Sequence, residues 1–96
     1  MYKIEYKRKA QKFIEAQSRK VQRQLILKIE DLQKDPRPAG AKCLDSEKKI
    51  YRVRSGNYRI IYQVHDKVLL VIIAKVDDRK DIYRNLENIK KRLGKI

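Results

Sequence analysis

The fold of this chain is decided by residues 50–64, which read IYRVRSGNYRIIYQV. β-Branched and aromatic residues alternate with polar ones on both sides of residues 55–57, SGN, and such a triplet typically joins two hairpin strands. If the turn has two residues, Arg54 lies directly opposite Arg59, and Arg52 projects from the same face. Facing like charges destabilise a sheet. The three arginines therefore indicate either a face that receives an anion or a solvated face in a basic protein.

The segments before this hairpin predict a strand followed by a helical hairpin. Residues 2–6 alternate apolar and polar side chains, which is typical of a strand. Residues 10–17 form a short amphipathic helix, and Ser18 is a plausible N-cap for a second one. Residues 35–40, DPRPAG, stop that helix because proline removes a donor and disfavours helix before it. The second helix has its apolar stripe at Val21, Leu25, Ile29 and Leu32.

The segments after the hairpin predict one more strand and a terminal helix. Residues 65–67 form a turn, and residues 68–74 are a nearly continuous apolar run, as expected of a central strand covered on both faces. Residues 82–93 carry apolar side chains at helical spacing. The order βααβββ with a C-terminal helix predicts a single α+β domain over residues 1–96, with an antiparallel sheet.

The charge of the chain points to an anionic partner. It has 96 residues, with 26 Lys and Arg against 12 Asp and Glu, for a formal net charge of +14. Such a field attracts nucleic acid, an anionic membrane surface or an acidic protein. Cys43 is the only cysteine and His65 the only histidine. We therefore expect neither a disulfide within the chain nor a structural zinc site, and we expect a cytoplasmic location. No apolar run is long enough to span a membrane, and the N-terminus does not look like a signal peptide.

A second candidate feature lies where the last strand meets the terminal helix. Arg79 and Tyr83 are four residues apart and would share one face of a first helical turn. A tyrosine beside arginines can stack on a base or orient a phosphate. The alternative is a partly buried tyrosine that packs the helix onto the sheet.

Residues 51–64 and 75–84, together with the strand and helical hairpin before them, resemble the RelE family of bacterial and archaeal toxins. The resemblance covers nearly the whole chain and implies a microbial ribonuclease-type fold. It further implies a toxin that enters the ribosomal A site, cuts messenger RNA and is held inactive by a cognate acidic, RelB-like antitoxin.

The resemblance also implies roles for individual residues. The family's catalytic positions fall on Arg54, Arg59, Arg79 and Tyr83. Arg52 would hold a neighbouring backbone phosphate, and further RNA contacts would come from Lys49, Lys80 and Arg84. The ribose 2′-OH would attack the adjacent phosphate and leave a 2′,3′-cyclic phosphate, with charge stabilised by arginines and with no metal or cofactor.

The chain departs from the family pattern at two places. Some relatives have a lysine in place of Arg54, where it can act as general base, but arginine stays protonated in proteins. If Arg54 cannot act as general base, either the ribosome supplies the base or catalysis depends only on charge stabilisation and positioning. Asp77 and Asp78 stand where many relatives have Gly-His. These carboxylates either weaken activity or cap the terminal helix.

Two other functions are compatible with the sequence. One is a non-enzymatic toxin of the related ParE type, which is thought to act on DNA gyrase and would tolerate changes at Arg59 and Tyr83. The other is a basic nucleic-acid-binding module without toxicity, for which the net charge alone would suffice.

Overall fold

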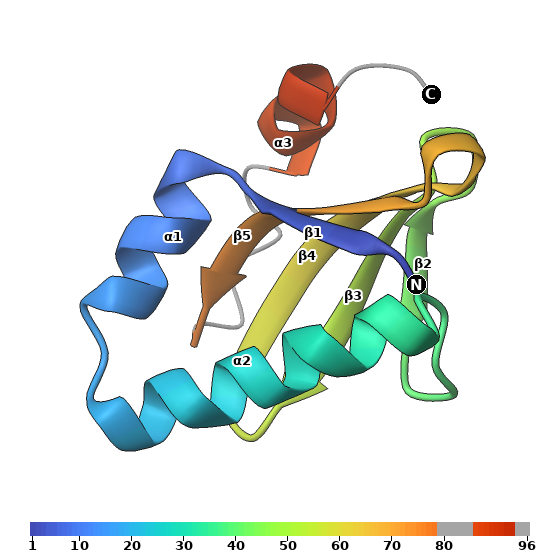
Figure 1. The fold of residues 1–96 in the computed structure, drawn as a ribbon. Coiled ribbons are helices and arrows are strands. Elements are labelled where there is room, and N and C mark those ends of the chain that lie inside the picture. The colour runs from blue at the N-terminus through green and yellow to red at the C-terminus, as the bar shows by residue number, and fades with distance from the viewer. Residues whose placement is uncertain (79–85, 94–96) are drawn as a thin grey trace.

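The computed structural model describes residues 1–78 and 86–93 as one five-stranded sheet with helices on both faces (Figure 1). Its strands lie in the order β1-β5-β4-β3-β2. The predicted α+β class and order of elements are confirmed. The elements are β1 (Lys3–Tyr6), α1 (Arg8–Glu15), α2 (Arg19–Lys34), β2 (Lys42–Asp45), β3 (Ile50–Ser55), β4 (Tyr58–His65), a 3-10 turn (Asp66–Val68), β5 (Leu70–Asp77) and α3 (Leu86–Leu93).

The sheet differs from the predicted one at both edges. Strand β1 pairs with β5 in parallel, whereas the other pairs are antiparallel, so the sheet is mixed. Alternation of side chains predicts a strand but carries no information about its direction relative to a distant partner. The opposite edge is β2, a short strand that the sequence did not predict because Lys42–Asp45 lacks an alternating pattern.

Helix α2 begins and ends where the sequence predicts. The Ser18 hydroxyl accepts a hydrogen bond from the backbone N–H of Val21 at 3.3 Å, so Ser18 is the N-cap. The helix ends at Lys34, directly before Asp35 and Pro36, and Asp35 is extended. Its buried stripe of Leu25, Ile29 and Leu32 packs on the sheet.

Strand β4 is the centre of the sheet, and every residue from Ile60 to Val64 is buried. Ile60, Tyr62 and Val64 belong to the core beneath α1 and α2, while Ile61 packs against α3. The strand predicted at residues 68–74 is β5, which lies beside the central strand and not at the centre of the sheet. It begins at Leu70 because the chain first makes a 3-10 turn and Leu69 adopts φ 52°.

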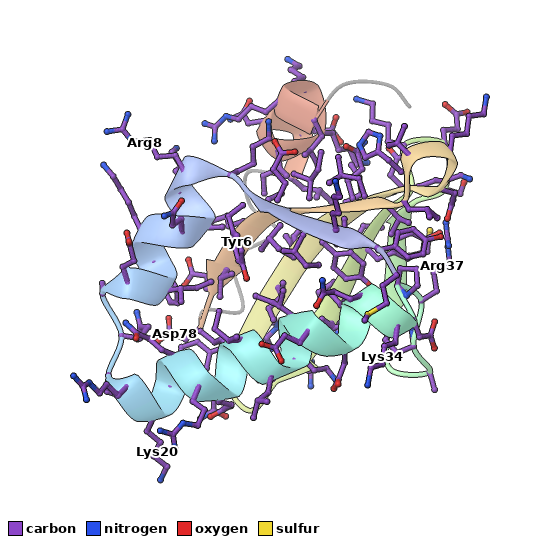
Figure 2. All side chains as sticks on the ribbon, in the orientation of Figure 1. Tyr6, Arg8, Lys20, Lys34, Arg37 and Asp78 are labelled. Carbon is purple, nitrogen blue, oxygen red and sulfur yellow. The ribbon has the colours of Figure 1, made fainter. Side chains whose placement is uncertain are left out.

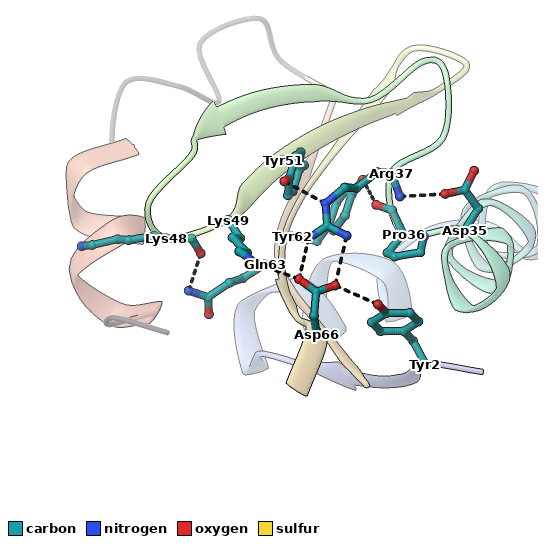
Figure 3. Close-up of polar contacts among 10 residues, drawn as sticks. All are labelled: Tyr2, Asp35, Pro36, Arg37, Lys48, Lys49, Tyr51, Tyr62, Gln63 and Asp66. Carbon is teal, nitrogen blue, oxygen red and sulfur yellow. Dashed lines mark hydrogen bonds and ion pairs between the residues drawn. The ribbon is translucent and has the colours of Figure 1, made fainter. Parts of the chain in front are cut away.

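One carboxylate joins four distant segments at the end of the sheet near the N-terminus (Figure 3). Asp66 accepts two hydrogen bonds from the Arg37 guanidinium, at 3.0 and 2.7 Å. It also accepts one from the Tyr2 hydroxyl at 2.8 Å and one from the Lys49 ammonium at 3.0 Å. The hydrogen bonds from Arg37, followed by those from Tyr2 and Lys49, hold the pKa of Asp66 well below its usual range.

The Arg37 side chain extends this network to two tyrosines. Its Nε donates to the Tyr51 hydroxyl at 2.9 Å, and its guanidinium lies 5.3 Å from the centre of that ring. The Tyr62 hydroxyl donates to the Pro36 carbonyl oxygen at 2.7 Å, and burial raises the pKa of Tyr62. The segment that follows α2 is thereby attached to β3 and β4 by directed hydrogen bonds.

We expect Asp66→Asn to lower the free energy of unfolding by roughly 1 kcal/mol at pH 7, because it weakens a partly exposed set of charged hydrogen bonds. Since the native pKa is depressed, this stabilisation is present above the unfolded pKa of about 3.9 and is lost as pH falls below it. Urea unfolding at pH 7 and pH 3 measures both effects, and the difference from wild type should shrink at pH 3.

Asp31→Asn is the matched control for this variant. Asp31 is an exposed α2 residue whose carboxylate makes no ion pair with the described part of the chain. The Asp31→Asn substitution should leave the midpoint of urea unfolding nearly unchanged. Equal stability of Asp66→Asn and Asp31→Asn at pH 7 would show that the network contributes nothing.

Candidate nucleic-acid site

The turn between β3 and β4 sets the geometry of the candidate site. Ser55 pairs with Tyr58, so Gly56 and Asn57 alone form the turn. Gly56 has φ 60°, a conformation that glycine adopts without steric cost. A Cβ at this position would also collide with the side-chain amide of Gln24 on α2. The turn therefore needs glycine for its backbone conformation, whereas the Gln24 amide, at the end of a flexible side chain, could move to admit a Cβ.

This turn places Arg54 directly opposite Arg59, which confirms the predicted register. Residues facing each other on antiparallel strands have Cα atoms about 4.5–5.5 Å apart. Arg52 stands two residues along β3 on the same face, opposite Ile61. We call Arg52, Arg54 and Arg59 the arginine cluster.

The arginine cluster lies on the face of the sheet that carries α3. Val53 and Ile60, which alternate with these arginines, are buried in the core under α1 and α2. Arg54 is exposed, whereas Arg52 and Arg59 are half-buried. The Arg52 Nε is buried and has no hydrogen-bond partner within the residues described. A buried donor without a partner is costly, so this group is available to an anion that reaches it.

An open pocket of about 480 Å³ lies beside the turn, and we call it the hairpin pocket. Two arginine side chains can bind a phosphate there through paired N–H donors. The pocket also contains one carboxylate, Asp78, which directly follows the end of β5 (Figure 2). Its lining residues are Arg54, Gly56, Asn57, Tyr58, Arg59 and Asp78.

The two aspartates differ in their positions. Asp77 is the last residue of β5 and faces Arg59 across the sheet. It therefore belongs to the sheet, and its Oδ1 accepts a hydrogen bond from the backbone N–H of Asp78 at 2.8 Å. The chain directly after Asp78, where these residues were expected to cap the terminal helix, lies outside the described residues.

Some predicted site residues are not part of this arrangement. Lys49 lies at the opposite end of β3 from the turn, where its ammonium pairs with Asp66. The structure therefore does not bring Lys49 to the arginine cluster. Four other predicted residues lie outside the described ranges: Arg79, Lys80, Tyr83 and Arg84.

A second basic surface, which the sequence analysis did not single out, lies between α1 and α3. A groove of about 370 Å³ has an apolar floor of Ala74, Ile89 and Leu93. A smaller adjoining hollow adds Lys75 and Asn88. We call the two together the α1–α3 groove. Its cations are Lys7, Arg8, Lys9, Lys75 and Arg92, and none of the described residues that line it is acidic.

The sequence does contain a signal for this groove, at residues 7–9, KRK. Arg8 and Lys9 stand in the first turn of α1, which has no acidic residue (Figure 2). Cations are unfavourable at this end of a helix because the macrodipole is positive there. Helix stability therefore does not explain their presence.

Helix α3 is held over the sheet by apolar and polar contacts. Ile89 packs with Ile50 and Ile61. The Lys90 ammonium lies 3.4 Å from the Asp45 carboxylate, and the Lys48 ammonium donates to the Lys90 carbonyl at 3.1 Å. The backbone N–H of Lys48, more than Lys90, lowers the pKa of Asp45. Lys90 thus has a structural contact, whereas Lys91 and Arg92 are exposed.

Neither a metal cluster nor a membrane span is evident in the part of the chain that the structure describes. No three His, Cys, Asp or Glu side chains lie together there in a group able to hold a metal ion. None of the helices in these ranges is long and apolar enough to cross a bilayer.

The family model for the ParE toxin of type II toxin–antitoxin systems, parDE, matches residues 4–83. The chain therefore belongs to this toxin family, within the RelE/ParE superfamily, and the resemblance to this superfamily is confirmed.

Particular relatives carry RelE-type names. Toxin RelG of Mycobacterium tuberculosis (strain ATCC 25618 / H37Rv) is 35% identical over 54 residues, which are 56% of this chain and 62% of that toxin. The chain thus matches less than two thirds of the length of RelG. A chain of the intact E. coli RelBE toxin–antitoxin complex superposes with a TM-score of 0.71 at 27% identity, over 83% of this chain and 99% of that one. The isolated E. coli RelE toxin superposes with a TM-score of 0.70 at 25% identity, over 92% of this chain and 97% of that one.

Gly56→Ala should destabilise the protein by about 1–2 kcal/mol, because an L-residue with a side chain resists this positive φ. Gly40→Ala is the matched control, since a Cβ at Gly40 meets nothing within 4 Å. Urea unfolding of the two variants tests this requirement. Equal midpoints would show that the turn tolerates a side chain and does not depend on glycine.

Proposed function

We propose that this protein is the toxin of a RelBE-type toxin–antitoxin system and cleaves messenger RNA in the ribosomal A site. The observation that carries the proposal is the facing pair Arg54 and Arg59 at the hairpin pocket. Two like charges in this register are unfavourable for the sheet alone. They are favourable around a phosphate, whose oxygens gain charge as the 2′-OH attacks.

The proposed cleavage mechanism combines the geometry of the arginine cluster with the resemblance to the RelE family. Arg54 and Arg59 stabilise the charge on the phosphate that is attacked, and Arg52 holds the neighbouring phosphate with its guanidinium. By the resemblance, Arg79 stabilises the leaving 5′-oxygen and Tyr83 orients the nucleotide, with Lys80 and Arg84 as further RNA contacts. The scheme uses no metal and leaves a 2′,3′-cyclic phosphate on one fragment and a 5′-OH on the other.

The α1–α3 groove supports a ribosomal location for this chemistry. Five cations without an acidic neighbour form a surface that attracts a phosphate backbone, and it lies on a part of the molecule separate from the hairpin pocket. In our proposal the groove binds ribosomal RNA while the arginine cluster holds messenger RNA. An acidic antitoxin of RelB type would neutralise the positive charges of the groove and the arginine cluster. We propose that both proteins act in the cytoplasm.

Arg59→Ala should lower the cleavage rate on programmed ribosomes by about 10²–10³-fold, because it removes a preorganised donor to the phosphate. Arg19→Ala, in the exposed first turn of α2, is the control of equal charge change and should cleave like wild type. The assay compares the same messenger RNA with and without ribosomes and identifies the fragment ends.

A second candidate function has its own support, because the matching family model is described as a ParE toxin. A gyrase inhibitor would leave messenger RNA intact on active ribosomes and would inhibit DNA supercoiling. That result would overturn the nuclease proposal and reassign the arginine cluster to partner binding.

Replacing Lys9 and Arg92 by Gln should weaken ribosome binding and reduce its dependence on salt, because fewer counterions are released on binding. The cleavage rate at saturating ribosomes should stay the same. The control replaces Lys20 and Lys34 by Gln, at the two ends of α2 (Figure 2), and has the same net charge. If both double variants lose affinity equally, the net charge rather than the groove accounts for binding.

A further inference from the structure

The proposed reaction needs a group that accepts the proton of the 2′-OH. Arginine does not serve, because its guanidinium stays protonated in proteins. His65, the only histidine, lies at the far end of β4 from the turn and its Nε2 lies 2.7 Å from the Gln63 amide oxygen. If this chain supplies the base from its described residues, the other residues of the hairpin pocket are the ones to consider.

Among the described residues that line that pocket, Asp78 is the one with an acidic side chain. Asn57 has no titratable group, and the Tyr58 ring packs against Phe13 with ring centres 6.1 Å apart. Asp78 is exposed, and its carboxylate makes no hydrogen bond or ion pair with any residue in the described ranges. A carboxylate that lines a pocket with two arginines, and that has no partner among the described residues, can act on a bound ligand.

The sheet determines where this carboxylate stands relative to the arginines. Arg59 faces Arg54 on one side and Asp77 on the other, so the three residues form a row across β3, β4 and β5. Neighbouring strands lie about 4.8 Å apart. Asp78 follows this row directly, and its N–H is bonded to the Asp77 side chain. A phosphate held by the two arginines is thus bordered by Asp78 from the β5 side.

We propose that Asp78 is the general base of the cleavage reaction, an inference that rests on the proposed nuclease function. The carboxylate takes the proton of the 2′-OH as the 2′-oxygen forms a bond to phosphorus. The bond from phosphorus to the 5′-oxygen breaks, and the 5′-oxygen keeps the electron pair and takes a proton from water. Asp78 then returns its proton to the resulting hydroxide, which restores the starting state.

Charge repulsion alone predicts the opposite behaviour for this residue. A carboxylate near a phosphate opposes RNA binding, so its removal should tighten binding and leave the chemical step intact or faster. A general base predicts a slower chemical step without weaker binding. The two roles therefore differ in the sign of the effect on rate.

The test is single-turnover cleavage of messenger RNA on programmed ribosomes by the wild-type protein and three variants. Asp78→Asn should slow cleavage by about 10²-fold or more. Its affinity for ribosomes whose messenger RNA has a 2′-deoxy nucleotide at the cut site should be equal or higher. Asp78→Glu, which keeps the carboxylate, should cleave at least tenfold faster than Asp78→Asn. Unchanged midpoints of urea unfolding show that the variants are folded.

Asp77→Asn is the neighbouring control. It removes the same charge, and its amide oxygen can still accept the Asp78 N–H. It should cleave much faster than Asp78→Asn, and an equal loss in both variants would overturn the inference, because the loss would not be specific to the Asp78 carboxylate. If the wild-type protein cleaves and Asp78→Asn cleaves equally fast, the general-base inference is overturned, but the proposed nuclease function is not. Absence of cleavage by the wild-type protein on active ribosomes overturns the proposed function and this inference with it.

Discussion

The register of the β3–β4 hairpin is the constraint on which the rest of this structure depends. It is set by a two-residue turn in which Gly56 adopts a positive φ against the Gln24 side chain. A shift of one residue would turn Val53 and Ile60 out of the core and the arginines into it. Burial of the apolar face thus enforces the facing arginines on the opposite face. The unfavourable repulsion between Arg54 and Arg59 is tolerated because the two-residue turn and the burial of the apolar face together set this register.

Paired charges and clustered like charges lie at opposite ends of the sheet. At one end, Asp66 binds Arg37 and Lys49 and joins the N-terminus to the segment after α2. At the other end, Arg54 and Arg59 share an open pocket in which Asp78 is the one acidic residue. Paired charges stabilise a fold modestly, whereas clustered like charges do so only with a ligand. This contrast explains why Lys49, though close in sequence to the arginine cluster, has a different role.

The basic surface is also divided in space. The hairpin pocket and the α1–α3 groove are lined by different residues, and the groove combines an apolar floor with five cations. Two separate cationic sites suit the proposed function, in which the protein holds a substrate strand and a much larger anionic partner at the same time. The groove exists because Ile89 anchors α3 on Ile50 and Ile61, which brings Arg92 near the start of α1.

The sequence alone determined the features that arise from neighbours along the chain. These include the Ser18 cap, the end of α2 before Pro36, and the turn that sets Arg54 opposite Arg59. Local conformation and side-chain periodicity determine each of them. Only the tertiary structure decided the parallel pairing of β1 with β5, the Asp66 network, the groove between residues 7–9 and Arg92, and the place of Asp78 beside the arginines. Each of these joins residues far apart in the chain, and their proximity results from burying two apolar faces of one sheet, which no local pattern encodes.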